Sequence, residues 1–260
     1  NYDAARENFA QVAATVSPAS SAIEQDAYLR TADCYFMNKD FKQALRMYEQ
    51  VLNQHLAGAD YALLQKAVIA GASSKNSEKV ALLQSLERQF PASGYAAESN
   101  MEIANTYMSD ENFQSAITPL KKVLKDDKAA ALHAQAYLKL GIAYFNMDRN
   151  AESLEQFKKL VTYYPNTQES TDAVEYIRNI FVSNQKPGDF MAFMQEQGRP
   201  VTYNEADSLT FRSAMIRYDA KDMNGAKAGF ADYLSKFPDG RYNIEANYFV
   251  AEIYIAGKDF

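Results

Sequence analysis

The side chains that could carry out catalysis or bind a soft metal are few in this chain. Cys34 is the only cysteine, and His55 and His133 are the only histidines, among 260 residues. Zinc motifs and nucleophile–base pairs need such residues at short spacings, whereas these three follow one another at intervals of 21 and 78 residues. Gly225 and Gly229 are not followed by the Lys and Ser or Thr of a phosphate-binding loop. The sequence therefore predicts no enzyme activity, no catalytic residue, no metal site and no cofactor.

The charge of the chain argues against nucleic acid as a partner. Its 33 acidic and 27 basic residues give a formal net charge of -6, which opposes the neutralisation of phosphates on which nucleic-acid binding depends. The basic run Lys121, Lys122 and Lys125 is followed directly by Asp126 and Asp127, as on a solvated helix face. A single cysteine allows no internal disulfide, and no apolar run approaches the roughly 18 residues of a membrane span. We therefore expect no nucleic-acid partner and no membrane span in this segment.

Small residues recur through the chain at a nearly constant spacing. They are Ala32, Ala67, Ala104, Gly141, Ala214 and Ala251, with Arg178 at the one place where a further small residue is expected. Successive positions lie 35 to 37 residues apart. A fixed period of this length indicates one supersecondary unit used repeatedly.

Each unit has the pattern of two amphipathic helices. In residues 133–165, Leu140 and Tyr144 share one face of a first predicted helix, and Phe157 and Leu160 share one face of a second. The polar segment 146–150 predicts the turn between them. Pro165 is expected to end the second helix, because the residue before a proline disfavours the helical region.

This pattern resembles the tetratricopeptide repeat, which has small residues where its two helices cross, an aromatic residue after the first and a proline at the end. Repeat four supplies Gly141, Tyr144, Ser153, Phe157 and Pro165. Repeat one has Ala32, Tyr35, Ala44 and Tyr48, and repeat three has Ala104, Tyr107, Ala116 and Leu120. Repeat six has Ala214, Ala226, Phe230 and Pro238, but Arg217 stands where the Tyr is expected. Repeat two has Ala67, Leu83 and Pro91, but Lys79 occupies its second small position.

The resemblance implies an all-α fold, a right-handed superhelical α-solenoid of helix hairpins with about 36–37 residues per repeat. We expect a single array over residues 1–260. It would comprise a preceding second helix (1–16), repeats at 25–56, 60–91, 95–128, 131–165, 170–198 and 206–238, and a first helix at 243–260. Neither end has the polar pattern of a capping repeat. The chain is therefore expected to be a segment of a longer array, with ends that allow self-association.

Two departures from the pattern fall within predicted helices. In the degenerate repeat 170–198, Arg178 and Phe190 occupy both small positions and should splay the hairpin or shift its register. This repeat is either a hinge or local binding feature, or a degenerate unit held by its neighbours. Pro119 lies inside the second helix of repeat three, where it should produce a kink.

The resemblance also implies a partner-binding inner wall formed by the first helix of each repeat. The expected protein- or peptide-binding residues are Phe36, Met37, Leu64, Val68, Met101, Asn105, Met108, Leu138, Ile142, Phe145, Phe211, Met215, Tyr218, Tyr248 and Ile255, with Leu29, Asp33 and Glu252 at equivalent positions. The alternative is that many of them pack against the neighbouring helix. Leu29, Asp33, Met101 and Leu138 stand where a carboxylate clamp would need Lys, Asn and Arg, which makes a peptide with an acidic C-terminus a poor candidate.

The helix-ending pairs Phe90-Pro91, Tyr164-Pro165 and Phe237-Pro238 resemble those in repeat proteins of the bacterial cell envelope, such as the outer-membrane assembly lipoprotein and the Tol-Pal coordinator. This resemblance implies a scaffold that binds a protein or peptide, periplasmic or associated with the outer membrane, although the sequence does not exclude the cytoplasm. Two alternatives stay open: a structural spacer within a longer repeat protein, and a module that binds peptidoglycan or another carbohydrate through some of the 18 tyrosines.

Overall fold

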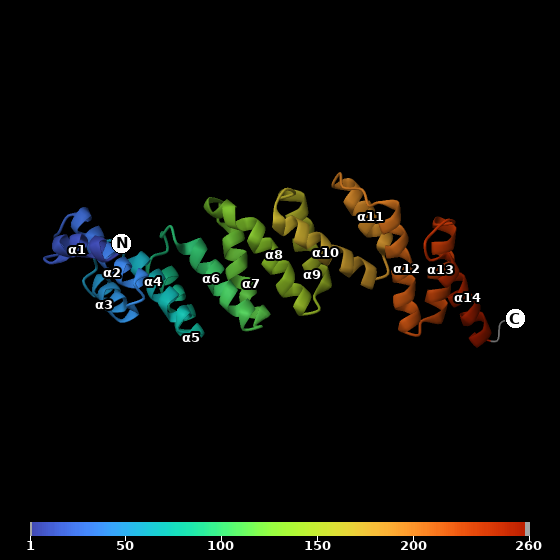
Figure 1. Cartoon of the computed structure of the whole chain (residues 1–260), viewed down its shortest axis with the longest axis horizontal. Helices are drawn as coiled ribbons and strands as arrows, with labels where there is room; N and C mark the ends of the chain where they lie inside the picture. Colours follow the sequence, from blue (N-terminus) through green and yellow to red (C-terminus); the bar gives the residue numbers. More distant parts are fainter. Residues whose placement is uncertain (1, 258–260) are drawn as a thin grey trace. The chain divides into compact units, whose positions relative to one another are not determined.

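A computed structural model describes residues 2–257, and every regular element in this range is helical (Figure 1). The outermost residues of the predicted segments 1–16 and 243–260, namely Asn1 and residues 258–260, lie outside the described part. The chain divides between Ala136 and Tyr137 into two compact units. The predicted all-α fold is confirmed, whereas the single array and its repeat boundaries stay predictions.

The first unit contains seven helices and the beginning of an eighth. They are α1 (Tyr2–Ala13), α2 (Ala22–Met37), α3 (Phe41–Asn53), α4 (Ala59–Ala72), α5 (Asn76–Gln89), α6 (Ala96–Ser109) and α7 (Phe113–Lys125), followed by the 3₁₀ turn η1 (Asp127–Ala129). The boundary between the units falls within α8 (Ala130–Asn146). Pairs α2–α3, α4–α5 and α6–α7 pack as successive hairpins, as the predicted repeat requires. Helix α7 continues through the buried Pro119.

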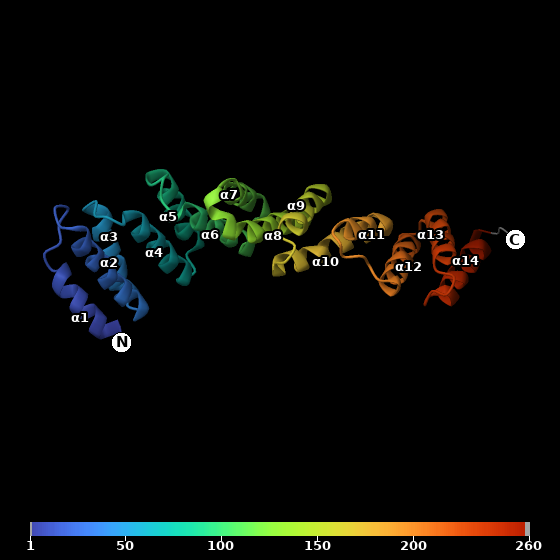
Figure 2. The same ribbon diagram turned by 90° about the horizontal axis from the view of Figure 1, so that it is seen from above.

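The second unit also consists of helices joined by short turns (Figure 2). It contains the rest of α8, then α9 (Asn150–Tyr163), α10 (Gln168–Ser183), α11 (Pro187–Glu196), α12 (Tyr203–Asp219), α13 (Met223–Lys236) and α14 (Asn243–Gly257). Helices α9 and α10 pack together, as do α12 with α13 and α13 with α14.

The turn within each hairpin has one recurring backbone conformation. Its second residue has a positive φ of 54 to 63° in six hairpins, although none of the six is glycine. These residues are Lys39, Ser74, Glu111, Asp148, Gln185 and Lys221. A left-handed residue ends a helix by turning the chain away from the helical path. The side chains of Asp40, Asn112 and Asp222 then cap the second helix by accepting a backbone N–H three residues later. The backbone conformation of the hairpin turn is therefore the same in these six hairpins, even though the turn sequence varies.

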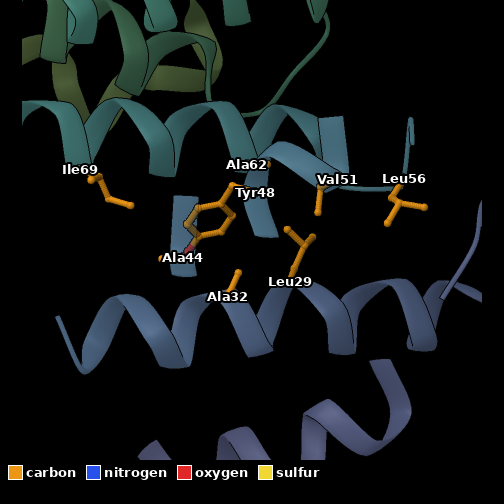
Figure 3. Close-up of a cluster of buried hydrophobic side chains, with 8 residues drawn as sticks. All are labelled: Leu29, Ala32, Ala44, Tyr48, Val51, Leu56, Ala62 and Ile69. Carbon is orange, nitrogen blue, oxygen red and sulfur yellow. The ribbon is translucent and has the colours of Figure 1, made fainter. Parts of the chain in front are cut away.

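The two helices of a hairpin touch at the small residues that set the sequence period. Ala32, Ala44, Ala67, Ala104 and Ala116 are all 0% exposed. Figure 3 shows the first of these contacts, where α2, α3 and α4 enclose the buried ring of Tyr48. In repeat four, the Ser153 hydroxyl donates a 2.9 Å hydrogen bond to the carbonyl of Gly141 across the crossing. Side-chain size at this one contact therefore decides how closely the helices approach.

Hairpin α4–α5 accommodates a long side chain at its crossing. Lys79 stands at the second small position, but its stem packs over Gly71, where an added Cβ would lie only 3.0 Å from the lysine Cδ. The ammonium reaches out to Glu102 at 2.6 Å. Because Gly71 has no side chain, it leaves room at this crossing for the stem of Lys79.

Hairpin α10–α11 departs from the others, as its two bulky residues predict. Phe190 is buried at 1% exposure, and the Arg178 guanidinium lies 5.7 Å from the centre of its ring. Helix α11 has 10 residues, and it packs less extensively on α10 than the second helices of α2–α3, α4–α5, α6–α7 and α12–α13 pack on their first helices. Two large side chains at the crossing therefore loosen this hairpin.

Polar side chains near the start of the first helices connect consecutive repeats. Seven residues before the small residue, Gln25 accepts the N–H of Ala57 at 2.6 Å, Asp60 accepts the hydroxyl of Ser93 at 2.6 Å, and Asp207 accepts the N–H of Arg241 at 3.1 Å. Each bond spans 32 to 34 residues, about one repeat. These bonds satisfy backbone and hydroxyl groups of the connecting loops, and they fix three of the repeats to the segment that follows.

Tyrosine hydroxyls complete these connections. Tyr233 donates to Asp207 at 2.6 Å and accepts the N–H of Tyr242 at 2.9 Å. Burial, and then the hydrogen bond to the Asp207 carboxylate, raise the pKa of Tyr233 to about 12. Tyr48 and Tyr61 both donate to Asp33, and burial followed by this carboxylate also raises the pKa of each phenol. All three tyrosines are therefore held in the neutral form.

Replacing Gly141 with Ala should destabilise the protein, because the added Cβ would lie 2.4 Å from Cε1 of the fully buried Phe157. Overpacking of this kind costs about 1–3 kcal/mol, which exceeds the gain in helix propensity of at most about 1 kcal/mol. Gly94→Ala is the matched control, since a Cβ at Gly94 meets no atom within 4 Å. Urea denaturation measures both variants. A wild-type midpoint for Gly141→Ala would contradict the close approach of α8 and α9.

The free energy of unfolding should fall as the pH rises from about 10 to about 12. A phenol whose pKa is raised by folding contributes stability that is complete below the unfolded pKa near 10 and is lost as the pH passes the folded pKa of about 12. Denaturant titrations between these pH values, with tyrosinate absorbance as a second signal, measure the loss. Tyr233→Phe should reduce the slope, whereas Tyr163→Phe, at a side chain 65% exposed, should retain it. Equal slopes for the wild type and Tyr233→Phe would refute this linkage.

Candidate functional site

The residues predicted to form the inner wall differ widely in exposure. Leu29, Leu64 and Met101 are buried, with only 4–6% of each residue exposed. Four others are exposed: Met37, Val68, Tyr248 and Ile255. The remainder are half-buried: Phe36, Asn105, Met108, Leu138, Ile142, Phe145, Phe211, Met215 and Tyr218, together with Asp33 and Glu252. Whether any of them contacts a partner stays a prediction.

Two of the predicted residues lie together in an open groove of about 490 Å³ in the second unit. Leu138 and Ile142 are one turn apart on α8 and form one side of the groove. The opposite side consists of Asp172, Glu175, Tyr176 and Asn179 on α10. The groove therefore combines an apolar surface from α8 with carboxylates from α10.

Aromatic contacts fix the ring of Tyr176 in this groove. The ring lies edge-on to Phe145 with centroids 5.3 Å apart, and it stacks on Phe157 at 4.9 Å. Phe157 is fully buried at the α8–α9 crossing. The predicted residue Phe145 therefore positions a neighbouring aromatic side chain, and the groove surface is preorganised by the core of repeat four.

The carboxylates give the groove a negative rim. Glu175 pairs with Arg178 at 2.5 Å, but the same guanidinium also pairs with Glu205 at 2.9 Å. Asp172 accepts a hydrogen bond from the neutral amide of Gln168 at 2.8 Å. The lining residues include two carboxylates and no basic side chain. The local charge is therefore negative even after the contribution of Arg178.

The residues on the α10 side of this groove were not predicted from the sequence. The predicted wall residues lie three residues before, and one, four or five residues after, the small residue of each repeat, as Leu29 and Asp33 do around Ala32. None was predicted around Arg178, because Arg178 is not small. If Arg178 is nevertheless taken as the reference position, the residues three before and one after it are Glu175 and Asn179, which both line the groove. The period of 35 to 37 residues was the signal that could have identified them.

None of the residues considered for chemistry at the outset lines the groove. Cys34 is buried on α2, and burial raises the pKa of its thiol, the opposite of what an activated thiolate requires. His55 is exposed after α3, and His133 on α8 contacts the carbonyl of Asp126 at 3.0 Å. Within residues 2–257 no three or more His, Cys, Asp and Glu side chains are grouped as metal ligands would be. None of the described helices has the length and apolarity needed to traverse a bilayer.

Sequence-family comparisons find the same repeat along much of the chain. A model described as a tetratricopeptide repeat-like domain matches residues 47–169. A second model, described as a tetratricopeptide repeat, matches residues 26–55 and 207–240. No curated protein matches the chain significantly.

Solved structures with the same fold are distant in sequence. One crystal structure of MamA protein has a TM-score of 0.52 at 18% identity, and the match covers 66% of this chain and 89% of MamA. MamA from Desulfovibrio magneticus RS-1 has a TM-score of 0.50 at 14% identity, covering 67% and 93%. A tetratricopeptide repeat protein from Parabacteroides merdae ATCC 43184 has a TM-score of 0.51 at 15% identity, covering 97% and 92%. These similarities concern the fold alone.

Proposed function

Because this chain belongs to the tetratricopeptide repeat family, we propose that it is a non-catalytic scaffold that binds a protein or peptide in the groove between α8 and α10. Stacked helix hairpins present extended surfaces to partners rather than enclosed catalytic centres. The observation that carries the proposal is the groove itself, in which the predicted residues Leu138 and Ile142 face a fixed tyrosine and two carboxylates.

The chemistry of the groove indicates what part of a partner it would contact. Leu138, Ile142 and the ring of Tyr176 offer apolar surface to one aliphatic or aromatic side chain. Asp172 and Glu175 favour a Lys or Arg next to that side chain, and they disfavour an acidic one. The proposed ligand is therefore an extended or helical segment with an apolar residue next to a basic residue.

Selection of a displayed random peptide library on the full chain tests this proposal. Enriched peptides should carry an apolar residue beside Lys or Arg. Their affinity, measured by fluorescence polarisation, should fall about tenfold or more with Ile142→Ser, because an apolar contact at the centre of the groove is lost. Asp172→Asn should weaken binding by a smaller, salt-dependent factor.

Val68→Ser is the matched control, since Val68 is an exposed predicted wall residue in the other unit. It should leave the affinity of the enriched peptides unchanged. Peptides that bind wild type and Ile142→Ser equally would exclude the groove as the binding surface. Failure to enrich any peptide would favour the alternative of a structural spacer.

The proposal places this scaffold in the bacterial cell envelope, either in the periplasm or at the outer membrane. Its support is the resemblance of the helix-ending pairs Phe90-Pro91, Tyr164-Pro165 and Phe237-Pro238 to those of envelope repeat proteins. Fractionation of the source cells, with immunodetection of the native full-length protein, tests the location. Recovery with the periplasmic or outer-membrane fraction is expected, and recovery with cytosolic markers would contradict it.

A further inference from the structure

A second hollow, of about 220 Å³, lies where α11 meets α12 and α13, and it shares no lining residue with the groove. Figures 1 and 2 both show α11 beside α12. Helix α11 packs less extensively on α12 than α3 packs on α4, or α5 on α6. Ala214, Ala228 and Gly229 line the hollow without filling it. The hollow is thus a consequence of the loosened α10–α11 hairpin and of small side chains facing it.

Arg217, which replaces the expected aromatic residue of repeat six, lines this hollow. Repeats one, three and four have Tyr35, Tyr107 and Tyr144 at the same position. Among the described residues Arg217 forms no ion pair, and its Nη1 makes only a long contact of 3.4 Å to the carbonyl of Gly225. One hairpin earlier, by contrast, Arg178 pairs with two carboxylates. The Arg217 guanidinium therefore retains donors for a ligand.

A second hydrogen-bond donor also lines the hollow. Ser213 is 6% exposed, and its hydroxyl makes no hydrogen bond to any described residue. The neighbouring Thr210, 5% exposed, already donates to the carbonyl of Ala206 at 2.8 Å. The Ser213 hydroxyl is therefore available to donate a hydrogen bond to a ligand in the hollow.

The charges of the residues around the hollow indicate which charge a bound ligand would carry. Asp232 also lines it, but Lys236 already pairs with that carboxylate at 2.8 Å. Asp222 is engaged in capping α13 through the N–H of Gly225 at 2.9 Å. Arg217 is the basic residue among those that line the hollow, and it has no ion pair there with any described residue. Its guanidinium can donate two parallel hydrogen bonds to a carboxylate. A volume near 220 Å³ is below the usual range for small-molecule sites, about 300 Å³ or more, and suits one side chain.

We propose that the hollow between α11, α12 and α13 receives the carboxylate of a partner's Glu or Asp side chain, held by Arg217 and by the hydroxyl of Ser213. This contact would be additional to the groove between α8 and α10 and opposite to it in charge preference. A partner that engages both would carry a basic residue at one point and an acidic residue at another.

Titration of the isotope-labelled full chain, followed by nuclear magnetic resonance, tests the proposal. The probe is N-acetyl-glutamic acid amide, and its isosteric control is N-acetyl-glutamine amide. The acidic probe should shift the signals of the Arg217 Nε–H and the Gly229 amide in a saturable manner, with an affinity about tenfold or more above that of the control. Acetate serves as a further arm: saturable shifts at equal concentration would assign the hollow to small free anions instead of a side chain.

Arg217→Gln should abolish the response of Gly229 to the acidic probe. Arg212→Gln, at an exposed position of the same helix, should leave it unchanged. If Arg217→Gln does not fold, Arg217→Tyr restores the residue found in other repeats and should fold without binding the probe, while Ser213→Ala should weaken binding. Equal responses to the two probes, or binding retained without Arg217, would overturn the proposal. Either result would leave the groove between α8 and α10 unaffected.

Discussion

The close approach of two helices at a pair of small residues is the contact on which the rest of the structure depends. At the α8–α9 crossing, Gly141 leaves the space that the ring of Phe157 fills. That ring in turn supports Tyr176 on the next helix. Because each repeat contacts mainly its neighbours, the position of a surface residue is set by the crossing inside its own hairpin and by the hairpin beside it. The position of Tyr176 at the groove surface thus depends on the buried contact between Gly141 and Phe157.

The α10–α11 hairpin lacks small residues at its crossing, and its two helices pack less closely. Arg178 and Phe190 stand at the crossing of α10 and α11, which pack less extensively than α2 and α3, and the Arg178 guanidinium pairs with Glu175 and Glu205. Glu175 belongs to the rim of the groove on one side, while α11 leaves the hollow beside α12 on the other. A repeat that is degenerate in sequence therefore adjoins both candidate binding surfaces. Since a defect in such an array stays local, the neighbouring repeats can remain regular.

The sequence predicted those features that depend on contacts within one repeat. The period of small residues located the hairpins, because Ala and Gly at a helix crossing are required by sterics wherever the hairpin forms. It also placed Leu138 and Ile142 on the groove side of α8. It did not separate Met101, which is buried, from Met37, which is 47% exposed, because the difference is made by neighbouring hairpins. The α10 side of the groove was missed since Arg178 did not look like the reference residue of a repeat.

The polar residues with the most perturbed environments serve the connections between repeats. Perturbed pKa values often mark catalytic groups, but Tyr48 and Tyr61 donate to one carboxylate, Asp33, and Tyr233 donates to Asp207. In each case burial favours the neutral phenol, which is the form that donates the hydrogen bond. The same carboxylate of Asp207 also accepts a backbone N–H from the following loop. These tyrosines and carboxylates thus have a structural role, since their hydrogen bonds fix one repeat to the next.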